Sequence, residues 1–187
     1  MPQDNLPQVP PGRTIGSDER PDLEMDEDVL VYHKILVPID FSDHSRSTVS
    51  YAIRFASRYK STVYLLHVFQ VPDYAITSQA CQRQNYAEVQ LQVDAAEQEA
   101  RESLESFAKE LSNLGINVEP HFRVGYPFDD IVLMANHFDV DLIVIGSHGR
   151  GGISRLLVGS TAQRVVEHAR CSVLVVKGSR TGKPRVE

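Results

Sequence analysis

The sequence predicts an α/β domain of the doubly wound type, with a mostly parallel sheet and helices on both faces. Short apolar, β-branched runs alternate along the chain with segments that repeat apolar residues at helical spacing. Alternation of this kind is typical of parallel strands joined by helical crossovers. The 187 residues, 42% hydrophobic and 24% charged, are sufficient for one domain with a sizeable core.

The first predicted strand covers residues 31–40, VYHKILVPID, which have the apolar character of a buried strand. Ser42 then offers a helix cap. The helix that follows has one apolar face at positions i, i+3, i+4 and i+7, made of Val49, Ala52, Ile53 and Ala56. A second strand is predicted over residues 61–69, STVYLLHVF.

A polar stretch from about 72 to 90 precedes a long helix, which Gly115 ends. Six apolar residues keep the helical period there: Ala100, Leu104, Phe107, Ala108, Leu111 and Leu114. Residues 116–124, INVEPHFRV, predict a third strand. Because its residues alternate between apolar and polar, we expect it near an edge of the sheet.

The remaining elements are two helices and two strands. Pro127 suits a first helical turn, and Asp129 and Asp130 favour the positive end of the helix dipole, so a helix is predicted from there to about His137. Residues 141–146, DLIVIG, predict the fourth strand. A last helix has an apolar face of Ala162, Val165, Val166 and Ala169, and residues 172–177, SVLVVK, predict the fifth strand.

The charge distribution divides the chain. Residues 1–30 hold eight acidic and two basic residues, a net charge of 2 − 8 = −6, which equals the net charge of the whole chain. We therefore expect an acidic, flexible tail over 1–30, a neutral domain over 31–178 and a short tail over 179–187. The acidic tail is interpreted as a solvated extension, with docking to a partner as the alternative. A domain without a basic stripe argues against binding to nucleic acid.

The sequence also gives an expectation for location. No apolar run approaches the roughly 18 residues that cross a bilayer. The first residues, MPQDNLPQVPPG, lack the pattern of a signal peptide. We expect a cytoplasmic protein without membrane binding. Cys81 and Cys171 have no spacing typical of zinc or redox sites and are expected to be free thiols.

Ligands of open parallel sheets bind beyond the carboxyl ends of the strands, where the strand order reverses. This rule directs attention to the loops after the first and fourth strands. The loop after the first strand begins at Asp40. The loop after the fourth strand is GSHGRGGISRLLVGST, residues 146–161, which is too polar for a core and too rich in glycine for an ordinary helix.

This glycine-rich stretch predicts a phosphate-binding cradle in two halves. Gly146 and Gly149 permit tight turns and let backbone N–H groups approach an anion. Gly159 and Ser160 lie at the start of the last helix, whose free N–H groups and dipole favour phosphate, and Thr161 adds a hydroxyl. Arg150 and Arg155 between the halves are possible charge partners. The alternative is that the glycines only turn the chain and Ser160 only caps the helix.

Other phosphate motifs do not fit. The segment GSRTGKP, residues 178–184, has the wrong spacing for a Walker A loop. A dinucleotide fingerprint GxGxxG is not met either, because Gly149 and Gly151 are followed three residues on by Ser154.

The spacing Gly146, two residues, Gly149, nine residues, Gly159-Ser160 resembles the ATP-binding signature of the universal stress protein family. The resemblance extends to KILVPID, DLIVIGSHGRGG and GSTAQRVVEHARCSVLVV, and so covers about residues 32–177. It implies a five-stranded parallel sheet in the order 3-2-1-4-5. In that order the first and fourth strands are neighbours, and their loops face one crevice.

The resemblance also implies roles for individual residues. Pro38 and Ile39 would line the adenine, Asp40 would contact the ribose or assist a metal, and a backbone group of Val68 would meet the adenine edge. The ribose and phosphates, with Mg²⁺ or Mn²⁺ alongside, would be surrounded by Gly146, His148, Gly149, Gly159, Ser160 and Thr161.

Several of these residues have simpler interpretations. Asp40 can be a turn residue, and His148 an idle loop residue. His67 lies inside a strand and is interpreted as a hydrogen-bonded histidine of the core or edge. Asp139 and Asp141 resemble a carboxylate pair, but at the entry of a buried strand they are expected to cap it.

The expected function is that of an ATP-binding stress-response protein in which nucleotide changes the shape or partner preference of the loop. No residue of the crevice is an obvious base for activating water, so we expect slow ATP hydrolysis at most. The alternatives are a phosphotransferase, and a protein-interaction module that binds cyclic AMP, another adenine nucleotide or none. The apolar last strand, Ser172 to Val176, would lie at a sheet edge, and relatives dimerise through it, so a homodimer is expected.

Overall fold

A computed structural model describes residues 31–72, 86–147 and 158–177. Of the two compact units of the chain, Met1–Leu30 lies outside the described residues, and the fold is that of the second, Val31–Glu187. Its elements are β1 (Lys34–Ile39), α1 (Asp43–Tyr59), β2 (Thr62–Phe69), α4 (Tyr86–Asn113), β3 (Asn117–Val124), α5 (Pro127–Phe138), β4 (Leu142–Gly146), α6 (Ser160–His168) and β5 (Ser172–Val176).

The five strands form one parallel sheet in the order β3-β2-β1-β4-β5. The predicted fold class and strand order are therefore confirmed. The β1–β2 ladder runs the full length of β1, from Lys34 opposite Thr62 to Ile39 opposite His67. The sheet reverses its direction of winding between β1 and β4, so this is where the carboxyl ends of neighbouring strands open to a ligand.

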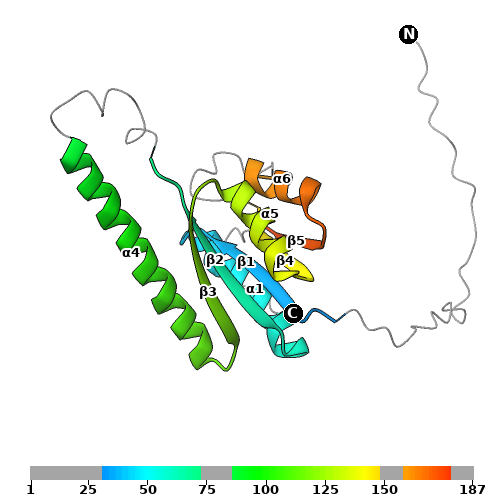
Figure 1. Ribbon diagram of the computed structural model, residues 1–187. Helices are drawn as coiled ribbons and strands as arrows, with labels where there is room; N and C mark the ends of the chain where they lie inside the picture. The colour runs from blue at the N-terminus through cyan, green and yellow to red at the C-terminus, as the bar shows by residue number, and fades with distance from the viewer. Residues whose placement is uncertain (1–30, 73–85, 148–157, 178–187) are drawn as a thin grey trace, which may run out of the picture. The chain divides into compact units, whose positions relative to one another are not determined.

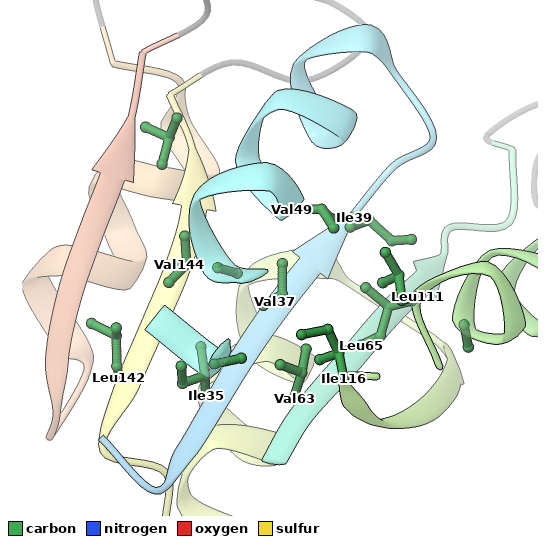
Figure 2. Packing of buried hydrophobic residues seen from close by; sticks show 14 of the residues in the cluster. Ile35, Val37, Ile39, Val49, Val63, Leu65, Leu111, Ile116, Leu142 and Val144 are labelled. Carbon is green, nitrogen blue, oxygen red and sulfur yellow. The ribbon is translucent and has the colours of Figure 1, made fainter. Parts of the chain in front are cut away.

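Each face of the sheet has its own hydrophobic core. On the face covered by α1 and α4, Ile35, Val37 and Ile39 of β1 pack with residues of β2, β4 and both helices (Figure 2). On the other face Leu36 packs with Leu66, Ile143 and residues of α5 and α6. Figure 1 shows α5 and α6 together on that face. Consecutive residues of β1 alternate between the two cores, as the two-residue period of a strand requires.

The helix boundaries follow from local chemistry. The Ser42 side chain accepts a hydrogen bond from the backbone N–H of Ser45 and caps α1, which confirms the predicted cap. Pro127 begins α5. Gly115, with a φ of 80°, follows the end of α4, a conformation that favours glycine.

Some details differ from the sequence prediction. α4 begins at Tyr86, inside the stretch expected to be polar loop up to about 90. Leu114 lies beyond the last residue of α4 and is 70% exposed, so it is not part of the apolar face. Val166 is likewise exposed. β1 begins only at Lys34, because Val31 to His33 lie before the first pair of the ladder.

The two edges of the sheet differ in character. β3, an edge strand as expected, has Pro120 in its middle and exposed charged residues at Glu119 and Arg123. β5, at the other edge, is SVLVV, without proline or charge. No helix in the described ranges is both long and apolar enough to cross a membrane.

Candidate functional site

The candidate site lies at the carboxyl edge of the sheet, around the ends of the neighbouring strands β1 and β4. The ladder between these strands covers Ile35 opposite Leu142 and Leu36 opposite Ile143, at their amino ends. Continued along both strands, the same register sets Ile39 level with Gly146. The ladder does not extend that far, and this is the position at which an open sheet admits a ligand.

Asp40 directly follows β1 and is held by the start of α1. Its backbone N–H donates to Ser45 Oγ at 2.9 Å. Its carboxylate oxygen Oδ1 accepts from Ser42 N–H at 3.1 Å and from Ser42 Oγ at 2.6 Å. The Ser45 hydroxyl donates to the same oxygen. Asp40 is therefore a turn residue with a fixed side chain, as the simpler interpretation proposed, and it stands at the predicted edge.

The residue after Asp40 has an unusual backbone. Phe41 has a φ of 62°, in the left-handed region that bulky side chains rarely adopt. Its ring packs on His67, with ring centroids 4.5 Å apart. His67 is buried, and its Nδ1 lies 2.9 Å from the carbonyl oxygen of Ile39. His67 is thus the hydrogen-bonded core histidine expected from its place in a strand.

The described parts of the predicted cradle, the end of β4 and the start of α6, lie next to each other. Ser147, directly after β4, is 2% exposed, and its N–H donates to the carbonyl of Val176 at 2.8 Å. Its own carbonyl accepts a hydrogen bond from the N–H of Gly159 at 2.7 Å. The end of β4 is therefore joined by a backbone hydrogen bond to the residue that begins α6.

The N-terminus of α6 differs from those of the other described helices. Gly159 is its N-cap residue, no side chain caps it, and its first turn has no acidic residue. The first turns of α1, α4 and α5 contain Asp43, Glu88, and Asp129 with Asp130, respectively. The partial positive charge at the start of α6 is thus not offset by a carboxylate of its own first turn. The exposed Ser160 and the half-buried Thr161 add hydroxyl groups there.

The remaining predicted residues are placed as follows. Ile39 is buried, and Pro38 and Gly146 are half-buried. Val68 is half-buried and packs against the core under α5 and α6. His148, Gly149, Arg150 and Arg155 lie outside the described residues, and so does Cys81. Described Cys171 is a free thiol, and burial raises its pKa, which makes it a poor nucleophile.

Ser45 and Phe41 are parts of the site that sequence reasoning missed. Ser45 is buried, and its hydroxyl both accepts from the Asp40 N–H and donates to Asp40 Oδ1. The only sequence signal is the run of hydroxyl and carboxylate residues in DFSDHS, residues 40–45. Neither strand nor helix period indicates that the chain folds back so tightly, because the turn depends on the left-handed Phe41.

The pair Asp139 and Asp141 is structural. Asp141 Oδ2 accepts from the N–H groups of His33 at 2.7 Å and Lys34 at 2.8 Å, and so caps the entry of β1 rather than that of its own strand. Asp139, with a φ of 51°, ends α5. Among the described side chains no group of three His, Cys, Asp or Glu residues is placed to hold a metal ion.

Comparison with known proteins gives one family. Residues 31–177 match the model of the universal stress protein family. Universal stress protein MJ0531 of Methanocaldococcus jannaschii is 32% identical over 158 residues, which cover 84% of this chain and 86% of that protein. The solved structure of MJ0577 from the same organism superposes with a TM-score of 0.69 at 30% identity, covering 81% of this chain and 99% of the other.

A further solved structure carries a nucleotide. The universal stress protein of Archaeoglobus fulgidus in complex with dAMP is 25% identical, with a TM-score of 0.53. The match covers 79% of this chain and 99% of the other.

Proposed function

Because the chain belongs to the universal stress protein family, we propose that it binds ATP at the carboxyl edge of β1 and β4 and acts as a nucleotide-dependent stress-response or regulatory protein. One observation carries the proposal above the others. The hydrogen bond from Gly159 N–H to the Ser147 carbonyl brings the end of β4 to the start of α6. A phosphate at the N-terminus of α6 therefore also lies beside the first glycine of the predicted cradle.

The residues would divide the nucleotide between them. The half-buried Pro38 and Val68 and the buried Ile39, at the ends of β1 and β2, offer an apolar place for adenine. Asp40 would contact the ribose hydroxyls. The N–H groups of the first turn of α6, with Ser160 and Thr161, would donate to the phosphates. His148 and Gly149 complete the proposed set.

Mg²⁺ or Mn²⁺ fits this site only as a companion of the phosphates. Asp40 is the one proposed metal ligand, and its Oδ1 already accepts from Ser42 and Ser45. Mg²⁺ in nucleotide sites takes most of its oxygens from phosphates and water and only one or two from carboxylates. Asp40 would supply one such carboxylate, and the ion would offset phosphate charge.

We propose weak hydrolysis or none. Activation of water needs a base in reach of the γ-phosphate, and Asp40, already engaged by two hydroxyls, is a poor base. Incubation with labelled ATP should yield little ADP and no phosphoprotein. Rapid ADP release or a labelled protein would favour the phosphotransferase alternative.

The site is tested by mass spectrometry of nucleotide released from the purified, denatured protein, together with Gly149→Val. The valine side chain should obstruct close approach of backbone to phosphate, so ATP affinity should fall by about tenfold or more. Gly115→Val, before the amino end of β3 and strained by the φ of 80° at that position, is the control: it should lower stability without lowering ATP affinity. Unchanged ATP affinity in Gly149→Val would overturn the proposed site.

A second candidate is another adenine nucleotide in the same cradle. The related Archaeoglobus fulgidus structure in complex with dAMP favours it, because dAMP has an adenine and a single phosphate. Competition of ATP, AMP, dAMP and cyclic AMP for one fluorescent adenine nucleotide separates these ligands. Failure of all four to compete would favour a protein-interaction module that binds no nucleotide.

A further inference from the structure

A groove of about 690 Å³ lies between the start of α1 and α4 and passes the end of β2. α4 lines it from Ala96 to Glu110, which corresponds to about 21 Å of helix rise. Small residues of α4, Ala96, Ala100 and Ser103, leave this space open. The lining of the groove therefore extends along about four turns of α4.

The walls of the groove combine aromatic and acidic side chains. Phe41 in the turn before α1, Phe69 of β2 and Phe107 of α4 supply apolar surface. Glu99, Glu102 and Glu110 stand along the α4 side. An aromatic floor with a charged rim is suited to a partner that is itself amphipathic.

The charge of the groove indicates the sign of the charge that a partner should have. α4 has seven acidic and two basic residues, a net charge of 2 − 7 = −5. Among the described lining residues the one arginine is Arg46, which lies over the Phe107 ring at 5.3 Å from its centroid. Three glutamates against one arginine leave the lining negative, so a complementary partner is basic.

We infer that this groove binds a basic amphipathic helix of a partner protein, with its apolar side on the aromatic floor and its Lys or Arg side chains toward Glu99, Glu102 and Glu110. An extended peptide would need a strand edge for its backbone hydrogen bonds. The sheet's edges are β3 and β5, whereas the described lining comes from β2, α1 and α4. A helix satisfies its own backbone, and about 14 residues would match the 21 Å of lining.

The groove shares Phe41 and Ser45 with the candidate nucleotide site, but the inference does not require that a nucleotide binds there. It also does not compete with association through β5, because α4 packs against β2 and β3 at the other side of the sheet. A dimer formed through β5 would leave the groove accessible in both copies.

The probe is a fluorescent, helical 14-residue peptide of leucine and lysine, with the leucines on one face, titrated into the full chain by anisotropy at low salt. Glu99→Gln with Glu102→Gln should weaken binding about fivefold, from two exposed charge pairs. The matched control is Glu88→Gln with Glu105→Gln, which changes the charge of α4 equally at two residues outside the groove lining. It should change affinity less than twofold.

Filling the groove tests its shape. Ser103→Trp, at an exposed position of the lining, should weaken binding of the Leu-Lys peptide about tenfold or more. Gln92→Trp, exposed on α4 but outside the lining, is the control and should have no effect. Circular dichroism of each variant confirms that the helices are intact.

Four results would overturn the inference. The first is that the peptide does not bind, and the second is that the two double variants weaken binding equally. The third is equal affinity for a scrambled Leu-Lys peptide that cannot form an amphipathic helix. The fourth is tighter peptide binding by a full-chain variant with Arg180, Lys183 and Arg185 changed to Gln. The last result would mean that the chain's own basic residues, rather than a partner, occupy the groove.

Discussion

At the scale of single residues, Phe41 is unusual because it has a positive φ without ending a helix. Lys60 and Asp139 also have positive φ, but each ends a helix, where that conformation is common. Phe41 lies in the turn between β1 and α1, beside Asp40. Strain of this kind persists where neighbouring contacts fix it, and here the contact is the His67 ring.

The strain at Phe41 can be measured by comparing two substitutions. Phe41→Ala and Phe41→Gly both remove the ring, but only glycine adopts a φ of 62° without penalty. The glycine variant should therefore be more stable than the alanine variant by about 1 kcal/mol in urea unfolding. The same pair of substitutions at Lys60 should show a similar difference. Equal stability of the two Phe41 variants would mean that the turn relaxes when the ring is lost.

His121 connects the protein's stability to pH. It lies on β3 among the rings of Tyr64 and Phe138, 5.8 and 4.5 Å away by centroids. Within the described structure its Nε2 is buried without a hydrogen-bond partner, and Glu119 is 3.9 Å away. Burial lowers the pKa of His121, Glu119 raises that pKa in part, and His137 lowers it further.

The sign of this pKa shift predicts a loss of stability in mild acid. His121 binds a proton less readily in the folded state than in the unfolded chain, where its pKa is near 6.5. The free energy of unfolding is therefore unaffected by His121 above that pH and declines below it. Urea midpoints should fall between pH 7.5 and 5.5, and His121→Phe should reduce that difference while keeping a ring in place. His33→Phe, at an exposed position, serves as the comparison. An unaltered pH dependence in His121→Phe would refute the assignment.

Only part of the candidate site could be predicted from the identities of its residues. Asp40 could be predicted, because an acidic residue at the end of a buried strand is visible in the sequence. Its bonds to Ser42 and Ser45 could not, since they require the left-handed turn at Phe41. Likewise the carboxylate of Asp141 was placed at a strand entry, but its bonds to His33 and Lys34 join segments more than 100 residues apart.

At the scale of elements, the turn from β3 into α5 depends on a close approach. A Cβ at Gly125 would lie 2.1 Å from Asp130 Oδ2. Asp130 is buried, and its Oδ1 accepts from Arg123 Nε at 2.9 Å. The Gly125 N–H also donates to the carbonyl of Phe69, which ties the turn to β2.

Gly125→Ala should therefore displace the Asp130 carboxylate from Arg123. We expect a loss of about 1–3 kcal/mol in unfolding free energy, the usual range for overpacking. In an Asp130→Ala background the same substitution should be far less harmful, because the obstructing carboxylate is absent. Additive losses in the double variant would show that Asp130 is not the cause.

The sequence period predicted the helices and strands correctly where their side chains are buried in the core. Leu104, Ala108 and Leu111 of α4 recur at helical spacing and are buried as expected. The first turns of α4 escaped prediction because YAEVQLQV, residues 86–93, has no clear apolar face: Leu91 is 70% exposed and Val93 is buried. Where a helix buries few side chains, its sequence has no apolar face from which the helix could be predicted.

At the scale of the whole molecule, the unequal edges of the sheet bear on assembly. We propose a homodimer formed through β5, as the sequence led us to expect. In the described part of the chain β5 is an edge strand without proline or charge, whereas Pro120, Glu119 and Arg123 make β3 a poor pairing edge. Light scattering at micromolar concentration should give twice the mass of the chain.

Charged substitutions distinguish the two edges. Val173→Lys on β5 should shift the mass toward that of the monomer, because lysine discourages edge pairing. Asn117→Lys, exposed on β3, should leave the dimer intact. A monomeric mass for the unsubstituted protein, or dissociation caused only by Asn117→Lys, would contradict assembly through β5.

The hydrogen bond between Gly159 and Ser147 also suggests where the protein can be labelled. Residues 147 and 159 are held together by their backbones, so the covalent path through 148–158 does not have to set their separation. Doubling the length of a loop adds only about 0.6 kcal/mol of closure entropy. We therefore expect a short tag inserted after Gly152 to leave the sheet intact.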